Sequence, residues 1–398
     1  MSSNPHYRSR WVILFIILLT SVAAPLNMFK VPPVLPLLMD YFRLSAGNAG
    51  SLMSVFALSG LLLAIPVGYL SQRLGYRMTG LIGLFSLIMG AGMGAFSQGA
   101  KSMLLSRFIE GIGMSLIAVS GPAMIALWFK SEQRGRAMGI WSTWLPIGST
   151  LMFMIAPQLA IRWTWREVWW FGCLFAFFVG ILYFLFVKTP PDFKVNGGAT
   201  IKSEKFDRGD LKVLLRNRDL WLISILFFFF DIAFISFLTW TPTFLYEVRG
   251  MSLPQASFLV SLIMLIKFFS HPFAGWISDK VGSRKLICVV PMLLLIPLFP
   301  LTFSIREEYF FILIFAFGII GGCVPTGIYS AGSEVLGDER LGGMAMGILQ
   351  TGQNAGILLG PLMFGWVVEF LGGWQTAFWV LAPISAIGGI AAWITKMK

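Results

Sequence analysis

Long apolar segments recur along the whole chain, and short polar stretches separate them. Each segment has about 20 residues or more, the length that an α-helix needs to cross the roughly 30 Å hydrocarbon core of a bilayer. Apolar and polar residues do not alternate within the segments, as they would in the strands of a membrane barrel. The pattern therefore predicts twelve membrane-spanning helices, at roughly 11–40, 47–71, 77–98, 102–129, 136–160, 166–188, 219–246, 254–278, 285–304, 309–335, 342–370 and 374–395.

The twelve predicted helices fall into two sets of six, and the long polar segment 189–218 separates the sets. This segment contains Pro190-Pro191, Gly197-Gly198 and alternating charges, a composition typical of a linker with at most a short surface helix. We therefore predict an N-terminal six-helix bundle over 1–188, a cytoplasmic linker over 189–218 and a C-terminal six-helix bundle over 219–398.

Composition and charge favour a membrane protein and argue against nucleic-acid binding. The 398 residues are 57% hydrophobic and only 12% charged, unlike a water-soluble protein. The net charge is +12, but 21 of the 30 lysine and arginine residues lie in the termini and loops on one side of the predicted bundle, against 6 on the other side. Because basic loops stay in the cytoplasm, we expect both termini there. The three cysteines stand singly in apolar segments and fit neither a metal site nor a disulfide framework.

A short polar, basic hairpin occurs twice, at corresponding places in the two sets of helices. The first copy is residues 68–77 (GYLSQRLGYR), and the second, 207 positions later, is residues 275–285 (GWISDKVGSRK). Gly111 and Gly318 are also 207 positions apart, and Gly139 and Gly347 are 208 apart. Six helices followed by six similar helices in the same orientation describe a parallel repeat.

The two hairpins resemble the signature loop of the major facilitator superfamily, glycine-x-x-x-aspartate-arginine-x-glycine-arginine-arginine. The second copy is nearly complete, whereas Gln72 in the first copy stands where the family has aspartate. The resemblance implies an all-α integral membrane fold, with twelve transmembrane helices in two parallel six-helix repeats around a central cavity. It also implies a monomeric secondary transporter of the inner (plasma) membrane that works by alternating access and needs no cofactor.

The same resemblance gives the hairpins a role in gating. In the family, the acidic residue of the loop sits near the cytoplasmic start of a helix, where a carboxylate complements the helix dipole, and nearby arginines pair with acids at the ends of spans. Such contacts would hold the outward-facing state, with a weaker latch at the uncharged Gln72; the alternative is a plain basic topology loop. The predicted gating residues are Gly68, Gln72, Arg73, Arg77, Gly275, Asp279, Lys280, Arg284, Lys285 and Glu334.

Ionisable residues inside the spans are the candidates for proton coupling. Arg107 and Glu110 share one face of the fourth span, in a stretch that resembles the family's arginine-x-x-glutamine-glycine-x-glycine motif. A charge at this depth costs about 2.5 kcal/mol or more. The two residues therefore form a permanent structural pair, or Glu110 takes a proton when Arg107 changes partner. Asp231, in the middle of the seventh span, is a proton carrier, the counter-charge of a lysine or a hydrogen-bonded packing residue.

Cationic side chains inside the spans point to an anionic substrate. Lys267 and His271, four residues apart in the eighth span, share one face. Residues 271–279 (HPFAGWISD) resemble a stretch of the nitrate and nitrite porters, in which an arginine precedes the proline and binds the anion. Histidine fills that position here, which argues against nitrate itself. Lys30 is a third candidate anion contact, although a lysine in the outer part of a span can instead snorkel to the interface.

Aromatic and polar residues complete the substrate-binding candidates. Residues 240–245 (WTPTFL) resemble the tryptophan-x-proline-x-x-leucine stretch of organic-anion symporters and cyanate-type porters and include Trp240. Trp144 lies beside a similar proline break in the fifth span, and Asn27 precedes Lys30 in the first span. The alternative for the tryptophans is packing or a place in the interfacial belt.

We interpret the chain as a transporter that takes up a small anion together with protons, with the lipid bilayer as its surroundings. A proton-driven exporter of drugs or metabolites is the alternative, although the fifth span lacks the glycine-proline-x-x-glycine-glycine stretch of drug/proton antiporters. A non-transporting membrane sensor is a third hypothesis. We do not expect an enzyme, because the sequence has no nucleotide-binding loop, zinc motif or appended soluble domain.

Overall fold

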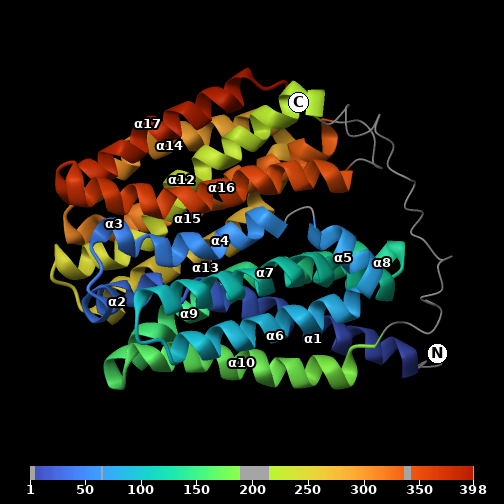
Figure 1. The fold of residues 1–398 in the computed structure, drawn as a ribbon. Coiled ribbons are helices and arrows are strands. Elements are labelled where there is room, and N and C mark those ends of the chain that lie inside the picture. The colour runs from blue at the N-terminus through green and yellow to red at the C-terminus, as the bar shows by residue number, and fades with distance from the viewer. Residues whose placement is uncertain (1–4, 64–65, 189–214, 336–341, 398) are drawn as a thin grey trace.

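The computed structural model describes residues 5–63, 66–188, 215–335 and 342–397, and these residues form helices and connecting turns without strands (Figure 1). Both termini lie at one end of the molecule, which we call the terminus side. The opposite end carries the turn between α2 and α3, and we call it the distal side. The predicted linker falls almost entirely on residues 189–214, outside the described ranges.

The first half of the chain contains six membrane-length segments, three of which are interrupted. The first segment is α1 with η1 and α2, the second is α3 with α4, and the fifth is α8 with α9. The helices of this half are α1 (Pro5–Met28), η1 (Pro32–Val34), α2 (Leu35–Phe42), α3 (Ala46–Ala49), α4 (Ser51–Leu63), α5 (Pro66–Leu74), α6 (Tyr76–Ala95), α7 (Ala100–Trp128), α8 (Ser131–Trp141), α9 (Trp144–Arg162) and α10 (Trp165–Phe186).

The second half contains six more segments, and its α-helices continue through their internal prolines. Packing against neighbouring helices makes such prolines tolerable in membrane proteins. The helices of this half are α12 (Arg218–Glu247), α13 (Leu253–Val281), α14 (Arg284–Ser304), η2 (Glu307–Tyr309), α15 (Phe310–Glu334), α16 (Gly342–Phe370) and α17 (Gly373–Ile394).

In the described part of the chain, eleven helical segments are both long enough and apolar enough to cross a membrane. The remaining predicted span corresponds to α16, which has 29 residues. Its sequence is less apolar because Gln350, Gln353 and Asn354 lie in its middle. Polar side chains inside a span normally face the protein interior. The predicted helical multi-pass architecture is confirmed.

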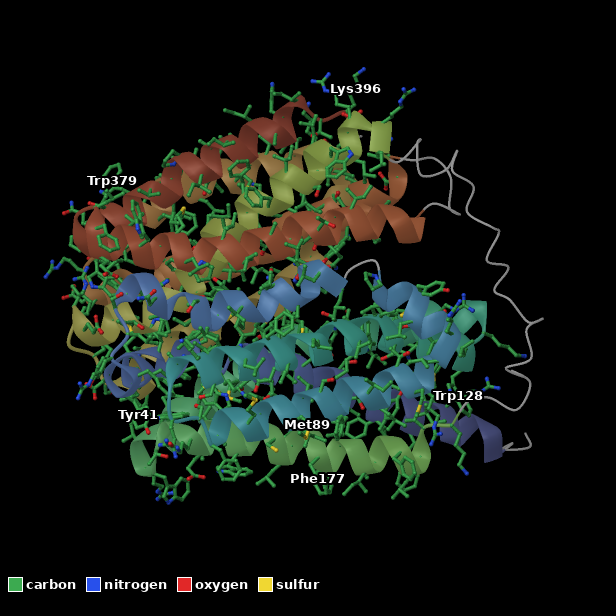
Figure 2. All side chains as sticks on the ribbon, in the orientation of Figure 1. Tyr41, Met89, Trp128, Phe177, Trp379 and Lys396 are labelled. Atoms are coloured by element: carbon green, nitrogen blue, oxygen red, sulfur yellow. The ribbon has the colours of Figure 1, made fainter. Side chains whose placement is uncertain are left out.

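Large apolar side chains cover the outside of the bundle. Figure 2 shows Phe177 of α10 and Trp379 of α17 on the outer surface, where they are 53% and 57% exposed. Such a surface would aggregate in water but suits the acyl chains of a bilayer.

The contacts between helices repeat in the two halves. In the first half, α1 packs on α9 and α10, and in the second half α12 packs on α16 and α17. Likewise, α7 packs on α4 and α6, whereas α15 packs on α13 and α14. The pair α6–α10 has its counterpart in α14–α17. The helices therefore pack in the order that the two hairpins 207 positions apart indicate for a parallel repeat.

The two halves meet through a limited set of helices, and among the described residues the hydrogen bond that joins them lies on the distal side. Helices α3 and α4 pack on α16, α9 packs on α13, and η1 touches α12 and α13, whereas α5 and α8 pack on helices of their own half. On the distal side, the Gly47 N–H donates to Glu369 Oε2 at 2.7 Å. In the described residues the halves are therefore joined at the distal side and in the middle.

Close backbone contact at Gly50 should control this distal closure. A methyl group at Gly50 would lie 2.2 Å from the carbonyl oxygen of Pro361 and 2.9 Å from the Cα of Leu362, both backbone atoms of α16. Overpacking of this kind costs about 1–3 kcal/mol. We therefore expect Gly50→Ala to open the distal side, so that a cysteine at the buried Ala49 reacts about tenfold faster with a membrane-impermeant thiol reagent.

The matched control is Gly139→Ala, because a methyl group at Gly139 would meet no heavy atom within 4 Å. This variant should leave the labelling rate of the Ala49→Cys reporter unchanged. Equal rates in the Gly50→Ala and Gly139→Ala backgrounds would show that the α4–α16 contact does not control distal closure.

Candidate functional site

A proline interrupts the first span and leaves a main-chain carbonyl without its helical donor. Helix α1 ends at Met28, and Pro32 lacks the N–H that would bond to the Met28 carbonyl. Arg107 of α7 supplies donors instead: Nη2 donates to the Met28 carbonyl at 2.9 Å and Nη1 to the Asn27 carbonyl at 2.7 Å. Its Nε donates to the Leu52 carbonyl of α4 at 3.0 Å. One guanidinium therefore joins α1, α4 and α7, with its charge at the end of a helix that favours cations.

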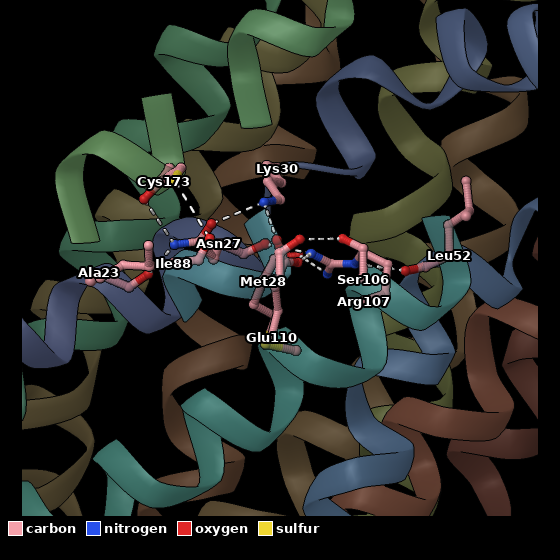
Figure 3. Close-up of polar contacts among 12 residues, drawn as sticks. Ala23, Asn27, Met28, Lys30, Leu52, Ile88, Ser106, Arg107, Glu110 and Cys173 are labelled. Carbon is pink, nitrogen blue, oxygen red and sulfur yellow. Dashed lines mark hydrogen bonds and ion pairs between the residues drawn. The ribbon is translucent and has the colours of Figure 1, made fainter. Parts of the chain in front are cut away.

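Glu110 lies between two cations, as Figure 3 shows. One carboxylate oxygen pairs with Arg107 and the other with Lys30, and all three side chains are fully buried. The Lys30 ammonium also donates to Asn27 Oδ1 at 2.9 Å and lies over the ring of Trp169, 4.7 Å from its centroid. We call Lys30, Arg107 and Glu110 the N-half charge cluster; each of its charges has a partner inside the protein.

The N-half charge cluster differs in one respect from the sequence prediction. Arg107 and Glu110 share a face and interact, as their spacing predicts. Lys30 was predicted to contact an anion or to snorkel, but in this conformation it is enclosed and faces Glu110. Because cations occupy both oxygens of Glu110, this carboxylate can accept a proton only when at least one of those contacts breaks.

The second half holds two ionisable groups that are less completely paired. Asp231 of α12 and Lys267 of α13 are 3% and 8% exposed, and each lies within electrostatic reach of the other. They form no direct ion pair, and the Lys267 ammonium makes no hydrogen bond to any described residue, although the Lys267 main-chain carbonyl accepts one from Ser270 Oγ at 3.1 Å. Its ammonium lies over the ring of Phe234 at 5.1 Å, and Asp231 Oδ2 is buried without a hydrogen-bond partner. Both groups therefore retain unused capacity to bind a ligand.

A phenol and an amide lie near Asp231, and a second amide extends the group. Tyr329 of α15 and Gln353 of α16 are both within electrostatic reach of the Asp231 carboxyl group. The Tyr329 hydroxyl of α15 donates to Gln353 Oε1 at 3.3 Å and accepts from Gln350 Nε2 at 3.4 Å. We call Asp231, Lys267, Tyr329, Gln350 and Gln353 the C-half polar cluster. The sequence prediction missed its last three members. Two glutamines at i and i+3 in a spanning helix are a signal for Gln350 and Gln353, whereas no sequence signal marks Tyr329.

His271 lies on the same face of α13 as Lys267, and its ring forms a hydrogen bond with a residue of the same half. Its Nδ1 lies 3.0 Å from Thr326 Oγ1, and the Thr326 hydroxyl donates to the Gly322 carbonyl at 2.8 Å. The hydroxyl proton is thus engaged, so His271 Nδ1 is the donor to Thr326. This bond fixes the ring and leaves Nε2 as the nitrogen that can meet a ligand or a proton.

The remaining substrate candidates have different surroundings. Trp144 is half-buried at the break between α8 and α9, where it stacks on Trp141 with ring centroids 5.6 Å apart. Trp240 is completely buried, and its Nε1 donates to the Pro361 carbonyl at 2.9 Å. The second tryptophan therefore packs between helices in this conformation and is not available to a ligand.

The hairpin of the second half is tied to a helix of the same half. Arg284 Nη1 donates to Asp279 Oδ1 at 2.6 Å and Nη2 lies 3.1 Å from Glu334 Oε1, so one arginine connects α13, α14 and α15. Lys280 and Lys285 lie over the rings of tryptophans at 5.0 and 5.1 Å. These predicted gating residues come together, but in this conformation they do not bridge the two halves.

The hairpin of the first half is likewise held within its own half. Arg77 donates to two carbonyls at the end of α10, at 2.6 and 2.9 Å. Arg73 lies over the ring of Tyr69 at 4.6 Å. The side chain of Gln72, which was predicted to form hydrogen bonds in the hairpin, is not among the side chains that the structure describes. A side chain would meet nothing within 4 Å at Gly68 and only a methyl group 3.8 Å away at Gly275, so close packing requires neither glycine here.

The family of the chain follows from comparison with known proteins. The model of the Major Facilitator Superfamily matches residues 17–344 and 250–398. The chain belongs to this superfamily and is a membrane transporter, not an enzyme.

Several curated relatives match over nearly their whole length. The chain is 22% identical to the hexuronate transporter of Bacillus subtilis, over 96% of this chain and 93% of that protein. It is 24% identical to a probable nitrate transporter of Staphylococcus epidermidis, with 92% and 90% covered, and 22% identical to the D-galactonate transporter of Escherichia coli, with 96% and 95% covered.

Solved structures show the same fold. A bacterial homologue of the human lysosomal transporter Spinster, in an inward-facing and unoccupied conformation, superposes with a TM-score of 0.81, 16% identity and coverage of 99% of this chain and 98% of that one. Its inward-facing, occupied form gives a TM-score of 0.82 at 15% identity. Together with the family match, this similarity confirms the predicted fold class.

The N-half charge cluster gives a stability test in which two substitutions should differ. Glu110→Gln leaves Lys30 and Arg107 buried together without a counter-charge, and breaking a buried pair in this way costs about 3–5 kcal/mol. Lys30→Met removes the additional cation and leaves the Arg107–Glu110 pair intact. We therefore expect Glu110→Gln to lower the apparent melting temperature in detergent much more than Lys30→Met does. The opposite order would contradict the pairing described here.

Proposed function

We propose that the chain is a secondary active transporter that carries a small anion together with protons across the inner membrane by alternating access. The basic loops favour cytoplasmic termini, so the terminus side would face the cytoplasm. With that orientation, the contacts on the distal side make this conformation inward-facing. The halves 1–188 and 219–398 would act as the two bodies that rock against each other around a central site, as in other transporters built from repeats.

The proposal of an anionic substrate rests on one observation, the ammonium of Lys267, which has no ion-pair partner among the described residues. A buried cation in a membrane span is costly unless something negative compensates it. Asp231 acts on Lys267 from a distance in this conformation, and a bound anion would supply a direct partner for the ammonium. The named cargoes of the relatives, hexuronate, D-galactonate and nitrate, have the same sign of charge and support the proposal.

Asp231 is the proposed proton carrier, in preference to Glu110. Both oxygens of Glu110 are held by cations, whereas Asp231 Oδ2 has no partner. An anion on Lys267 would cancel the attraction that favours the ionised form of Asp231, so that anion binding and proton uptake would occur together. In this scheme Arg107 and Lys30 hold the first half together, and His271 is a further contact for the anion on the Lys267 face.

Transport in the opposite direction is the second candidate. One relative with 24% identity is named nitrite extrusion protein. Protons would then move against the anion instead of with it. Alkalinisation outside the proteoliposomes during anion uptake would support symport, and acidification outside would support antiport.

Asp231→Asn should separate transport from accumulation. The variant keeps the shape of the side chain but cannot bind and release a proton. We expect it to exchange labelled D-galacturonate or nitrate across proteoliposome membranes, yet to build up no gradient when a proton gradient is imposed. The control is Asp40→Asn, which alters an exposed carboxylate. Full proton-driven accumulation by Asp231→Asn would remove Asp231 from the coupling mechanism.

Lys267→Gln tests the sign of the substrate. We expect at least a hundredfold weaker binding of the transported anion, because the substitution removes the only direct counter-charge proposed for it. Lys101→Gln, at an exposed lysine, is the matched control and should bind normally. Binding can be measured by calorimetry on purified protein. Unchanged affinity in Lys267→Gln would contradict the anion site, and the exporter of cationic or neutral compounds would become the leading hypothesis.

A further inference from the structure

We propose that the C-half polar cluster recognises a polyhydroxylated carboxylate, a sugar acid with one carboxylate and several hydroxyl groups. This inference rests on the proposed function, because it takes Lys267 as the anion contact. It adds the chemistry of the rest of the substrate, which the charge of Lys267 alone does not define.

The first argument concerns the donors and acceptors of the two charged groups. The Lys267 ammonium has three donors and no acceptor, so it matches a carboxylate. Asp231 Oδ2 is an acceptor without a donor, on a side chain that is 3% exposed. An ionised inorganic anion, or a carboxylate on a bare hydrocarbon chain, brings no donor to that oxygen. A hydroxyl group beside the carboxylate of the substrate does.

The second argument concerns the two protonation states of a proton carrier. The Asp231 carboxylate only accepts hydrogen bonds, whereas the protonated acid also donates one. A substrate hydroxyl can both donate and accept, so it fits Asp231 before and after proton uptake. A nitrate oxygen fits only the protonated form.

The third argument concerns Tyr329, Gln350 and Gln353. Their mutual hydrogen bonds are long, at 3.3 and 3.4 Å, and Tyr329 is 36% exposed. Long hydrogen bonds are weak, so these groups can replace them with hydrogen bonds to a ligand. A phenol and two amides offer donors and acceptors side by side, which is what a row of hydroxyl groups needs. A polar site of this kind rejects analogues that lack the hydroxyls, because its own groups would be left unpaired.

Five probes of matched size or charge test the inference by calorimetry on the purified full-length protein. D-gluconate and D-galactonate carry a carboxylate and hydroxyls, and hexanoate has the same chain length without hydroxyls. D-glucitol has the hydroxyls without the charge, and nitrate has the charge alone. We expect one of the two sugar acids to bind at least a hundredfold more tightly than hexanoate, nitrate or D-glucitol, at about tenfold for each hydroxyl that finds a partner.

The outcomes separate this inference from the proposed function. If hexanoate or nitrate binds as tightly as the sugar acids, the anion proposal stands and hydroxyl recognition is wrong. If D-glucitol binds as tightly as the sugar acids, the anion proposal itself fails. Failure of both sugar acids to bind would overturn the inference.

Two conservative variants locate the hydroxyl contacts. Gln353→Leu and Tyr329→Phe should each weaken binding of the better sugar acid about tenfold and leave hexanoate binding unchanged. Gln158→Leu and Tyr309→Phe, at exposed positions away from the cluster, are the matched controls. Tyr329→Phe removes one oxygen atom and keeps the ring, so it tests the contact even if Gln353→Leu does not fold. Equal loss for both ligands, or no loss for either, would contradict the assignment.

Discussion

An ionised group inside an apolar helix bundle must find its counter-charge and its hydrogen bonds within the protein or on a ligand. The two halves of this chain meet this constraint in different ways. In the first half, Glu110 is shared by Lys30 and Arg107, and Arg107 also takes up the carbonyls at the break in α1. In the second half, Lys267 has no direct partner and one oxygen of Asp231 has none. The first arrangement holds helices together, and the second leaves binding capacity unused.

This difference arises although the two halves have nearly the same arrangement of helices. Corresponding helices pack on each other in corresponding order, and the halves exchange α4–α16 and α9–α13 contacts. Gly50, between α3 and α4, lets the backbone there approach α16 closely, and Glu369 accepts a hydrogen bond from the N–H of Gly47 beside that contact. The polar contacts of each hairpin join residues of its own half. They therefore stabilise each half separately and do not restrain the interface between the two halves.

The sequence was sufficient for the positions of the membrane spans and for contacts between near neighbours, but not for the breaks inside the first two spans. The fourth span was predicted at 102–129 and is Ala100–Trp128, and the i, i+3 spacing of Arg107 and Glu110 brought them together. Contacts between distant segments were not accessible in this way. The pairing of Lys30 with Glu110 crosses 80 residues and depends on how α1 breaks and turns towards α7. The grouping of Asp231, Tyr329 and Gln353 requires three helices to pack in one order, so a linear pattern could not reveal it.

The central claim is that the missing partner of Lys267 is the substrate. An experimental structure of the protein with D-galactonate or D-gluconate tests it most directly. The account predicts the carboxylate of the ligand on Lys267 and its hydroxyl groups on Asp231, Tyr329 and Gln353, with the N-half charge cluster unchanged. A ligand bound at Lys30 and Arg107, or one that leaves Lys267 without a partner, would contradict it.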